Sequence, residues 1–190
     1  MQTALQEPNA AELDGLRSHF CTQGVEVLLH DSGLVTRQDA YRESVSDRLA
    51  AADLVLVTGG SPERLCGRTI GTPALTALRA ASESGAVIAG CSAGAVVTGA
   101  GMPIGKGDHR RPLPLWEWLP RTVVAPHFGL FDIEPWVQDF ADCSVLGIPN
   151  DAMALILRGV DLENIGDRAL ILRTGAQVQQ IGPAQRARLR

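Results

Sequence analysis

Residues 86–99 read AVIAGCSAGAVVTG, an apolar run that meets a glycine-rich turn and continues into small residues. The run from Ala86 to Ala89 predicts a buried strand, and the small residues after the turn predict a helix packed closely on a sheet. Between them, Gly90-Cys91-Ser92-Ala93-Gly94 matches the pattern Gly-x-Ser-x-Gly in a strand–turn–helix context. This pattern predicts an α/β fold with a nucleophile elbow, in which the hydroxyl of Ser92 stands clear of the sheet.

Other interpretations of this turn remain open. A glycine-rich turn also serves simply to pack a helix on a strand, or to bind phosphate through backbone N–H groups. Cys91 is a competing nucleophile, although it lies off the central position between the two glycines.

Apolar runs and helical periodicity alternate along the rest of the chain. Leu13, Leu16 and Phe20 share one helical face, and Thr72-Pro73 is a good helix start. The expected strands are residues 25–29, 53–58, 86–89, 122–125, 152–157, 169–172 and 177–181. The early alternation favours right-handed βαβ units and a mostly parallel sheet, whereas the closely spaced late strands favour an antiparallel edge or hairpin. Residues 99–120 form the one long irregular stretch in this pattern. Because no linker interrupts the alternation of strands and helices, we expect a single domain over residues 1–190.

Composition excludes several classes of function. The 190 residues carry a net charge of −4 and are 45% hydrophobic, and the basic residues are scattered. We therefore expect no nucleic-acid partner. Neither a long apolar span nor a signal peptide is indicated, so no membrane association is expected and a cytoplasmic location is favoured. The four cysteines lack paired spacing and are expected to be reduced thiols.

Two further motifs follow predicted strands. Gly60 ends the Thr58-Gly59-Gly60 loop after DLVLVT, and its backbone N–H could form an oxyanion hole together with that of Ala93. His127 follows the strand RTVVA, and loops at the carboxyl ends of parallel strands lie at one edge of a sheet. Histidine is the usual base for a serine hydroxyl near neutral pH, so His127 is the candidate base, with a purely structural histidine as the alternative.

TGGSPERL, AGCSAGA and APHF, in this order and spacing, resemble the dipeptidase E and cyanophycinase family of serine peptidases. The resemblance runs from about Leu13 to Leu157. It implies a flavodoxin-like three-layer sandwich with a mostly parallel central sheet, related to class I glutamine amidotransferases. It also implies hydrolysis of a peptide or amide bond next to an aspartyl residue, with Ser92 as nucleophile, His127 as base, and Gly60 and Ala93 as oxyanion donors.

The chain departs from this family in three places. It opens MQTALQEPNA, where the family has a strand, and an uncovered sheet edge makes a homodimer a reasonable expectation. Relatives carry an acid just before Met-Pro, where this chain has Gly101. Asp108 is then the best third catalytic residue by distance from Ser92, and Glu117 is second. The arginine-rich run of cyanophycinases after His-Phe is missing, which favours a dipeptidase-like substrate.

An aspartyl substrate requires a cationic partner, and Arg64, Arg110 and Arg111 are the candidates. No metal or organic cofactor is expected, because acyl transfer needs none and no ligand spacing suggests one. An amidotransferase-type glutaminase would have cysteine at position 92, and an α/β-hydrolase would place its histidine near the chain end; neither fits. The remaining alternative to a serine hydrolase is a catalytically degenerate relative that binds a small ligand or a protein.

Overall fold

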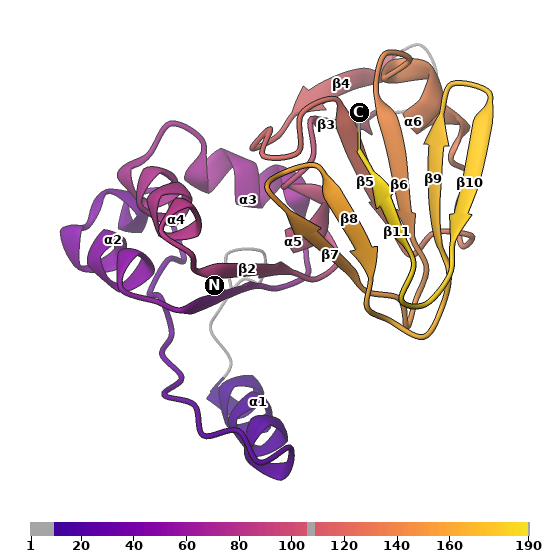
Figure 1. Cartoon of the computed structure of the whole chain (residues 1–190). Helices are drawn as coiled ribbons and strands as arrows, with labels where there is room; N and C mark the ends of the chain where they lie inside the picture. Colours follow the sequence, from indigo (N-terminus) through magenta and orange to yellow (C-terminus); the bar gives the residue numbers. More distant parts are fainter. Residues whose placement is uncertain (1–9, 106–108, 190) are drawn as a thin grey trace. The chain divides into compact units, whose positions relative to one another are not determined.

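A computed structural model describes residues 10–105 and 109–189 of the chain (Figure 1). They group into two compact units, Met1–Ala89 and Gly90–Arg190. The structure shows an α/β protein whose strands form small sheets of mixed direction. The expected single domain stays a prediction.

The first unit builds a small core between helices and a two-stranded sheet. Its elements are α1 (Ala10–Thr22), the 3₁₀ helix η1 (Asp39–Tyr41), α2 (Glu43–Ala50), β1 (Leu54–Val57), α3 (Pro62–Thr69), α4 (Pro73–Glu83) and β2 (Val87–Gly90). β1 is hydrogen-bonded to β2. The core contains Val45 and Leu49 from α2, Val57 from β1, Leu65 from α3 and Leu78 from α4.

Helix starts in this unit follow their sequence signals. The Thr72 hydroxyl accepts the N–H of Leu75 at 3.5 Å, with Pro73 at the first helical position, as the sequence predicts. The Ser61 hydroxyl accepts the N–H of Arg64 at 3.2 Å at the start of α3, a helix that the sequence analysis missed. In both cases a side-chain oxygen satisfies an N–H that the first helical turn leaves unpaired.

The strand predicted at residues 25–29 is wrong. These residues form no strand, and Leu28 is 86% exposed. A short apolar run specifies a strand only when a neighbouring strand is available to pair with it. The sheet described in this unit consists of β1 and β2, and neither pairs with residues 25–29.

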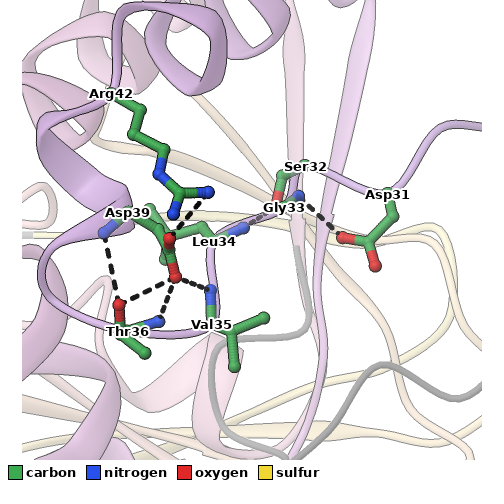
Figure 2. A network of polar contacts seen from close by, with 8 residues as sticks. All are labelled: Asp31, Ser32, Gly33, Leu34, Val35, Thr36, Asp39 and Arg42. Atoms are coloured by element: carbon green, nitrogen blue, oxygen red, sulfur yellow. Dashed lines mark hydrogen bonds and ion pairs between the residues drawn. The ribbon is translucent and has the colours of Figure 1, made fainter.

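Asp39 organises the turn that leads into η1 and α2 (Figure 2). Its Oδ2 accepts the N–H and the hydroxyl of Thr36, at 2.7 and 2.8 Å, and the N–H of Val35 at 3.3 Å. Its Oδ1 lies 3.1 Å from a guanidinium nitrogen of Arg42. The bonds from the N–H and then the hydroxyl of Thr36 are the main reasons that the pKa of Asp39 is lowered; Val35 and Arg42 act in the same direction, and burial opposes them.

We expect Asp39→Asn to lower the free energy of unfolding by about 1–3 kcal/mol at pH 7, because an amide group cannot replace a carboxylate that accepts several N–H and O–H groups. A lowered pKa means that the carboxylate stabilises the fold above its unfolded pKa of about 3.9 and loses this effect as pH falls through its folded pKa. Urea unfolding at pH 7 and pH 3 should therefore show a difference from wild type that shrinks in acid. The exposed Asp47→Asn is the matched control, and an equal effect of both variants at pH 7 would contradict this role.

The second unit is built mostly of strands. Its elements are α5 (Ala93–Val96), β3 (Gly101–Ile104), β4 (Arg111–Pro114), β5 (Thr122–Pro126), α6 (Glu134–Asp139), β6 (Ser144–Ile148), β7 (Ala154–Leu157), β8 (Asp161–Asn164), β9 (Leu170–Thr174), β10 (Gln177–Ile181) and β11 (Arg186–Arg188). The sheet orders are β10-β9-β6-β5, β11-β8-β7 and β3-β4. β5 is parallel to β6, whereas β6 with β9 and β9 with β10 are antiparallel.

The outcome for the predicted sheet is mixed. The late hairpin is confirmed, since β10 pairs antiparallel with β9. The stretch 99–120 is not wholly irregular, because β3 and β4 form an antiparallel pair inside it. Across residues 10–105 and 109–189 the strands fall into four small sheets. The mostly parallel central sheet therefore stays an expectation.

β5 is a buried strand that leads into the candidate site. Val124 packs in one apolar cluster, and Val123 and Ala125 pack in another. Alternate residues of a strand point to opposite faces, so both faces of β5 are covered. The residue that follows β5 is therefore carried on a strand with little freedom to move.

Candidate active site

Ser92 lies in a tight turn directly before α5. Its backbone has φ 51° and ψ −113°, a conformation that non-glycine residues rarely adopt. The carbonyl oxygen of Ser92 accepts the N–H groups of Ala95 and Val96 at 2.9 and 3.0 Å, which holds the turn closed. The predicted elbow geometry around Ser92 is thus present. The helix that follows it, however, is a single turn of four residues.

The glycines of the elbow are required by close backbone approach. A Cβ atom at Gly90 would lie 2.4 Å from the carbonyl oxygen of Gly94 and 2.7 Å from the backbone nitrogen of Ala95. Both contacts are with backbone atoms of the helical turn, which have no freedom to rotate away. Gly90 therefore permits the close packing that places Ser92 at its strained φ.

His127 lies immediately after β5, also with a positive φ of 55°. The next residue, Phe128, donates its N–H to the carbonyl of Ile148 at 3.2 Å. Its ring lies over Gly147, where a Cβ would come within 2.3 Å of Phe128 Cδ2. The backbone after β5 is thus fixed against β6, and it turns the imidazole of His127 out to an exposed position.

The side chains of Ser92 and His127 are in contact. Ser92 Oγ lies 2.9 Å from His127 Nε2, and His127 Nδ1 lies 2.7 Å from Oδ1 of Asn150. An amide oxygen only accepts hydrogen bonds, so Nδ1 carries the proton in that contact. In the neutral imidazole, Nε2 is then free to accept the hydroxyl proton of Ser92. This is the arrangement in which a histidine activates a serine.

Asn150 was missed by the sequence analysis. It lies two residues after β6, and β6 runs parallel to β5 with Ile148 opposite Pro126. The carboxyl ends of neighbouring parallel strands lie at the same edge of a sheet, so Asn150 is carried to His127. The signal was the five-residue run Ser144 to Ile148 with a polar residue two positions after it, and a strand this short does not stand out from its surroundings.

The two predicted third residues have different outcomes. Asp108 lies outside the described residues. Glu117 is exposed in a turn after β4, and the described partner of His127 Nδ1 is Asn150. At Gly101, a Cβ would lie 2.4 Å from the ring of Phe140, so no larger residue fits there in this structure.

The predicted oxyanion donors belong to different units. Gly60 has φ 128° and lies in the first unit, whereas Ala93 is the first residue of α5 in the second unit. The N–H of Ala93 has no acceptor within its own helix. The joint role of the two residues stays a prediction.

The predicted cationic residues differ in how they are held. Arg110 donates to both carboxylate oxygens of Asp139, at 3.0 and 3.1 Å, and to Oε1 of Gln138 at 2.9 Å. Arg111, on β4, and Arg64, on α3, are both exposed. The charge of Arg110 is thus already matched by the carboxylate of Asp139, and the substrate-binding role of the three arginines stays a prediction.

The described cysteines differ in burial and in their distance along the chain from Ser92. Burial raises the pKa of Cys66 to about 12, and burial is also the main cause of the raised pKa of Cys143. Cys91 is an exposed free thiol, but the described hydrogen bond to His127 Nε2 comes from Ser92. Within residues 10–105 and 109–189, no group of three or more histidine, cysteine or acidic residues is arranged to hold a metal ion.

A comparison with protein families assigns the chain to one of them. The model of peptidase family S51 matches residues 16–163, most of the chain. The chain belongs to peptidase family S51. The resemblance to dipeptidase E is confirmed, and membership makes this protein a member of a family of hydrolases that cleave peptide bonds. No curated protein matches the chain.

Solved structures support the S51 fold. A peptidase from an acI-B1 Actinobacterium is similar with a TM-score of 0.80 and 22% identity, over 99% of this chain and 82% of that chain. A putative peptidase E protein from Listeria monocytogenes EGD-e has a TM-score of 0.53 and 17% identity, over 100% of this chain and 84% of that chain. At these identities the likeness concerns the fold. No helix in the described residues is long and apolar enough to cross a membrane.

Proposed function

We propose that this S51 protein is a serine peptidase in which Ser92 is the nucleophile and His127 the general base. The observation that carries the proposal is the 2.9 Å contact between Ser92 Oγ and His127 Nε2, with Nδ1 held by a hydrogen-bond acceptor on the opposite side of the ring. A strained serine in a glycine turn, beside an oriented imidazole, is what acyl transfer requires.

The proposed reaction has two halves. His127 Nε2 takes the hydroxyl proton of Ser92 as Oγ bonds to the scissile carbonyl carbon. The imidazolium then gives that proton to the leaving amine as the C–N bond breaks, which leaves an ester on Ser92. In the second half, His127 takes a proton from water, the hydroxide attacks the ester, and the proton returns to Ser92 Oγ as the acid product leaves. The N–H of Ala93 would stabilise the oxyanion of each intermediate.

We propose an aspartyl residue next to the cleaved bond as the substrate feature, on the strength of the family resemblance. The exposed guanidinium of Arg111 is a candidate partner for its carboxylate, and Arg64 is a second. We also propose that the protein has a flavodoxin-like fold with a mostly parallel central sheet, that it is located in the cytoplasm, and that it forms a homodimer. No cofactor or metal takes part in it.

A panel of dipeptides tests the proposal. We expect the wild-type protein to release amino acids from Asp-Leu or β-Asp-Leu, and to leave Asn-Leu and Ala-Leu largely intact, because an arginine recognises a carboxylate and not an amide of the same shape. Product amines are measured by mass spectrometry. Equal cleavage of Asp-Leu and Asn-Leu would contradict the proposed aspartyl specificity but would still support the proposed peptidase activity. No cleavage of any member by folded protein would favour the degenerate ligand-binding relative.

A further inference from the structure

We propose that Asn150 is the positioning residue for His127, so that a neutral amide stands where serine hydrolases usually carry a carboxylate. The inference rests on the proposed function. It starts from the 2.7 Å contact between Asn150 Oδ1 and His127 Nδ1, which lies on the side of the imidazole opposite Ser92.

The turn that carries Asn150 is held from two sides. On one side β6 pairs in parallel with β5, which leads to His127. Within the turn, the N–H of Ala152 bonds to the carbonyl of Pro149 at 3.2 Å. After the turn, Met153 accepts the N–H of Ile165 at 3.0 Å. The backbone segment that carries Asn150 is thus held by hydrogen bonds on both sides of the turn.

The hydrogen bonds of a fully buried asparagine, Asn164, hold the segment that follows this turn. Asn164 is 0% exposed, and its Nδ2 donates to the carbonyls of Arg168 and Ile181, each at 2.8 Å. Its Oδ1 accepts the N–H of Gly166 at 3.0 Å. A Cβ at Gly166 would lie 2.4 Å from the backbone nitrogen of Met153, so the two segments are in close backbone contact. This network fixes the base of the Asn150 turn.

An amide in this position can orient the imidazole as a carboxylate does, but it carries no charge. It accepts the Nδ1 proton and so sets the tautomer and the ring orientation that leave Nε2 free to act as base. It adds no negative charge to stabilise the imidazolium that forms when Ser92 is deprotonated. Asn150→Asp should therefore favour the charged imidazolium, because an opposite charge nearby stabilises it.

Other titratable groups on the neighbouring segments are few. Cys91 lies beside Ser92 and Asp151 beside Asn150, and Asp132 lies farther along the loop after His127. The Asp132 carboxylate is engaged by the N–H of Glu134 at 3.0 Å. In the described residues, the imidazole accepts from the hydroxyl of Ser92 at Nε2 and donates from Nδ1 to Oδ1 of Asn150, so a changed pH profile in an Asn150 variant can be assigned to the second contact.

The test compares Asn150→Ala, Asn150→Asp and, as matched control on the same turn, Asp151→Asn. The main readout is the rate at which a fluorophosphonate labels Ser92, measured against pH. We expect Asn150→Ala to slow labelling about 100- to 10,000-fold. Asn150→Asp should restore it, with the acidic limb of the profile moved up by about one pH unit or more. Asp151→Asn should behave as wild type. Labelling of Asn150→Ala at the wild-type rate, or its loss without rescue by aspartate, would overturn the inference.

Nitrogen-15 NMR of the histidine ring separates this inference from the proposed function. We expect the wild-type spectrum to show His127 with the proton on Nδ1, and Asn150→Ala to show a mixture of tautomers. If wild-type Ser92 is never labelled, the serine peptidase proposal fails, but the spectrum still tests Asn150. An unchanged tautomer in Asn150→Ala would contradict the positioning role even if the enzyme is active.

Discussion

Ser92→Ala, His127→Ala and the double variant are expected to hydrolyse the best dipeptide at one shared residual rate, at least about 10⁴-fold below wild type. Ser92 and His127 act as one unit across their 2.9 Å contact, so removing either side chain removes the activated nucleophile. The second substitution then has nothing left to remove. Values of kcat for the three variants, with circular dichroism to show that each is folded, provide the measurement.

The neighbouring Cys91 supplies the control for this experiment. Cys91→Ser keeps the size of the exposed side chain beside the nucleophile and should retain activity near the wild-type level. Losses that multiply in the double variant would mean that Ser92 and His127 act independently. Loss of activity in Cys91→Ser, with activity retained in Ser92→Ala, would identify the thiol as the nucleophile.

Gly90→Ala is expected to remove activity and to lower the free energy of unfolding by at least about 2 kcal/mol. The new methyl group would meet backbone atoms of Gly94 and Ala95, so the turn and α5 must shift to accept it. That shift would release the strained backbone of Ser92 and move Oγ away from His127. Urea unfolding measures the first effect, and kcat measures the second.

Gly67→Ala is the matched glycine variant. A Cβ at Gly67 meets no atom within 4 Å outside its own helix backbone, and its φ is not positive. Within α3 an alanine should be neutral or stabilise the fold by about 0.5–1 kcal/mol, because it restricts the unfolded chain. If Gly90→Ala and Gly67→Ala have the same stability and activity, the close approach in the elbow does not control the site.

Elements with strong local signals could be predicted from the sequence. The helix start at Thr72-Pro73, the strand at residues 122–125 and the hairpin of β9 and β10 are all present. The contact of Ser92 with His127 also followed from local patterns, because each residue comes within a few positions of the end of an apolar run. In these cases a few neighbouring residues decide the structure.

What the sequence concealed depends on partners far along the chain. β3 and β4 contain Pro103, Pro112 and Pro114, and proline normally counts against a strand, although it is tolerated in a two-stranded pair that is all edge. The strand at residues 25–29 had the right composition but finds no partner in the described sheet. Asn150 is hard to predict because the sequence favours an acid close to Ser92 as the third residue, whereas the pairing of β6 with β5 brings an amide from farther along the chain.

Reaction of the wild-type protein with a fluorophosphonate, followed by intact mass and peptide mapping, tests the central proposal most directly. We predict one adduct per chain, located on Ser92. The adduct should be lost in His127→Ala because the base is gone, and reduced by prior addition of an aspartyl dipeptide that the protein hydrolyses. An adduct on a different residue, or folded protein that remains unmodified at neutral pH, would contradict the proposal that Ser92 is an activated nucleophile.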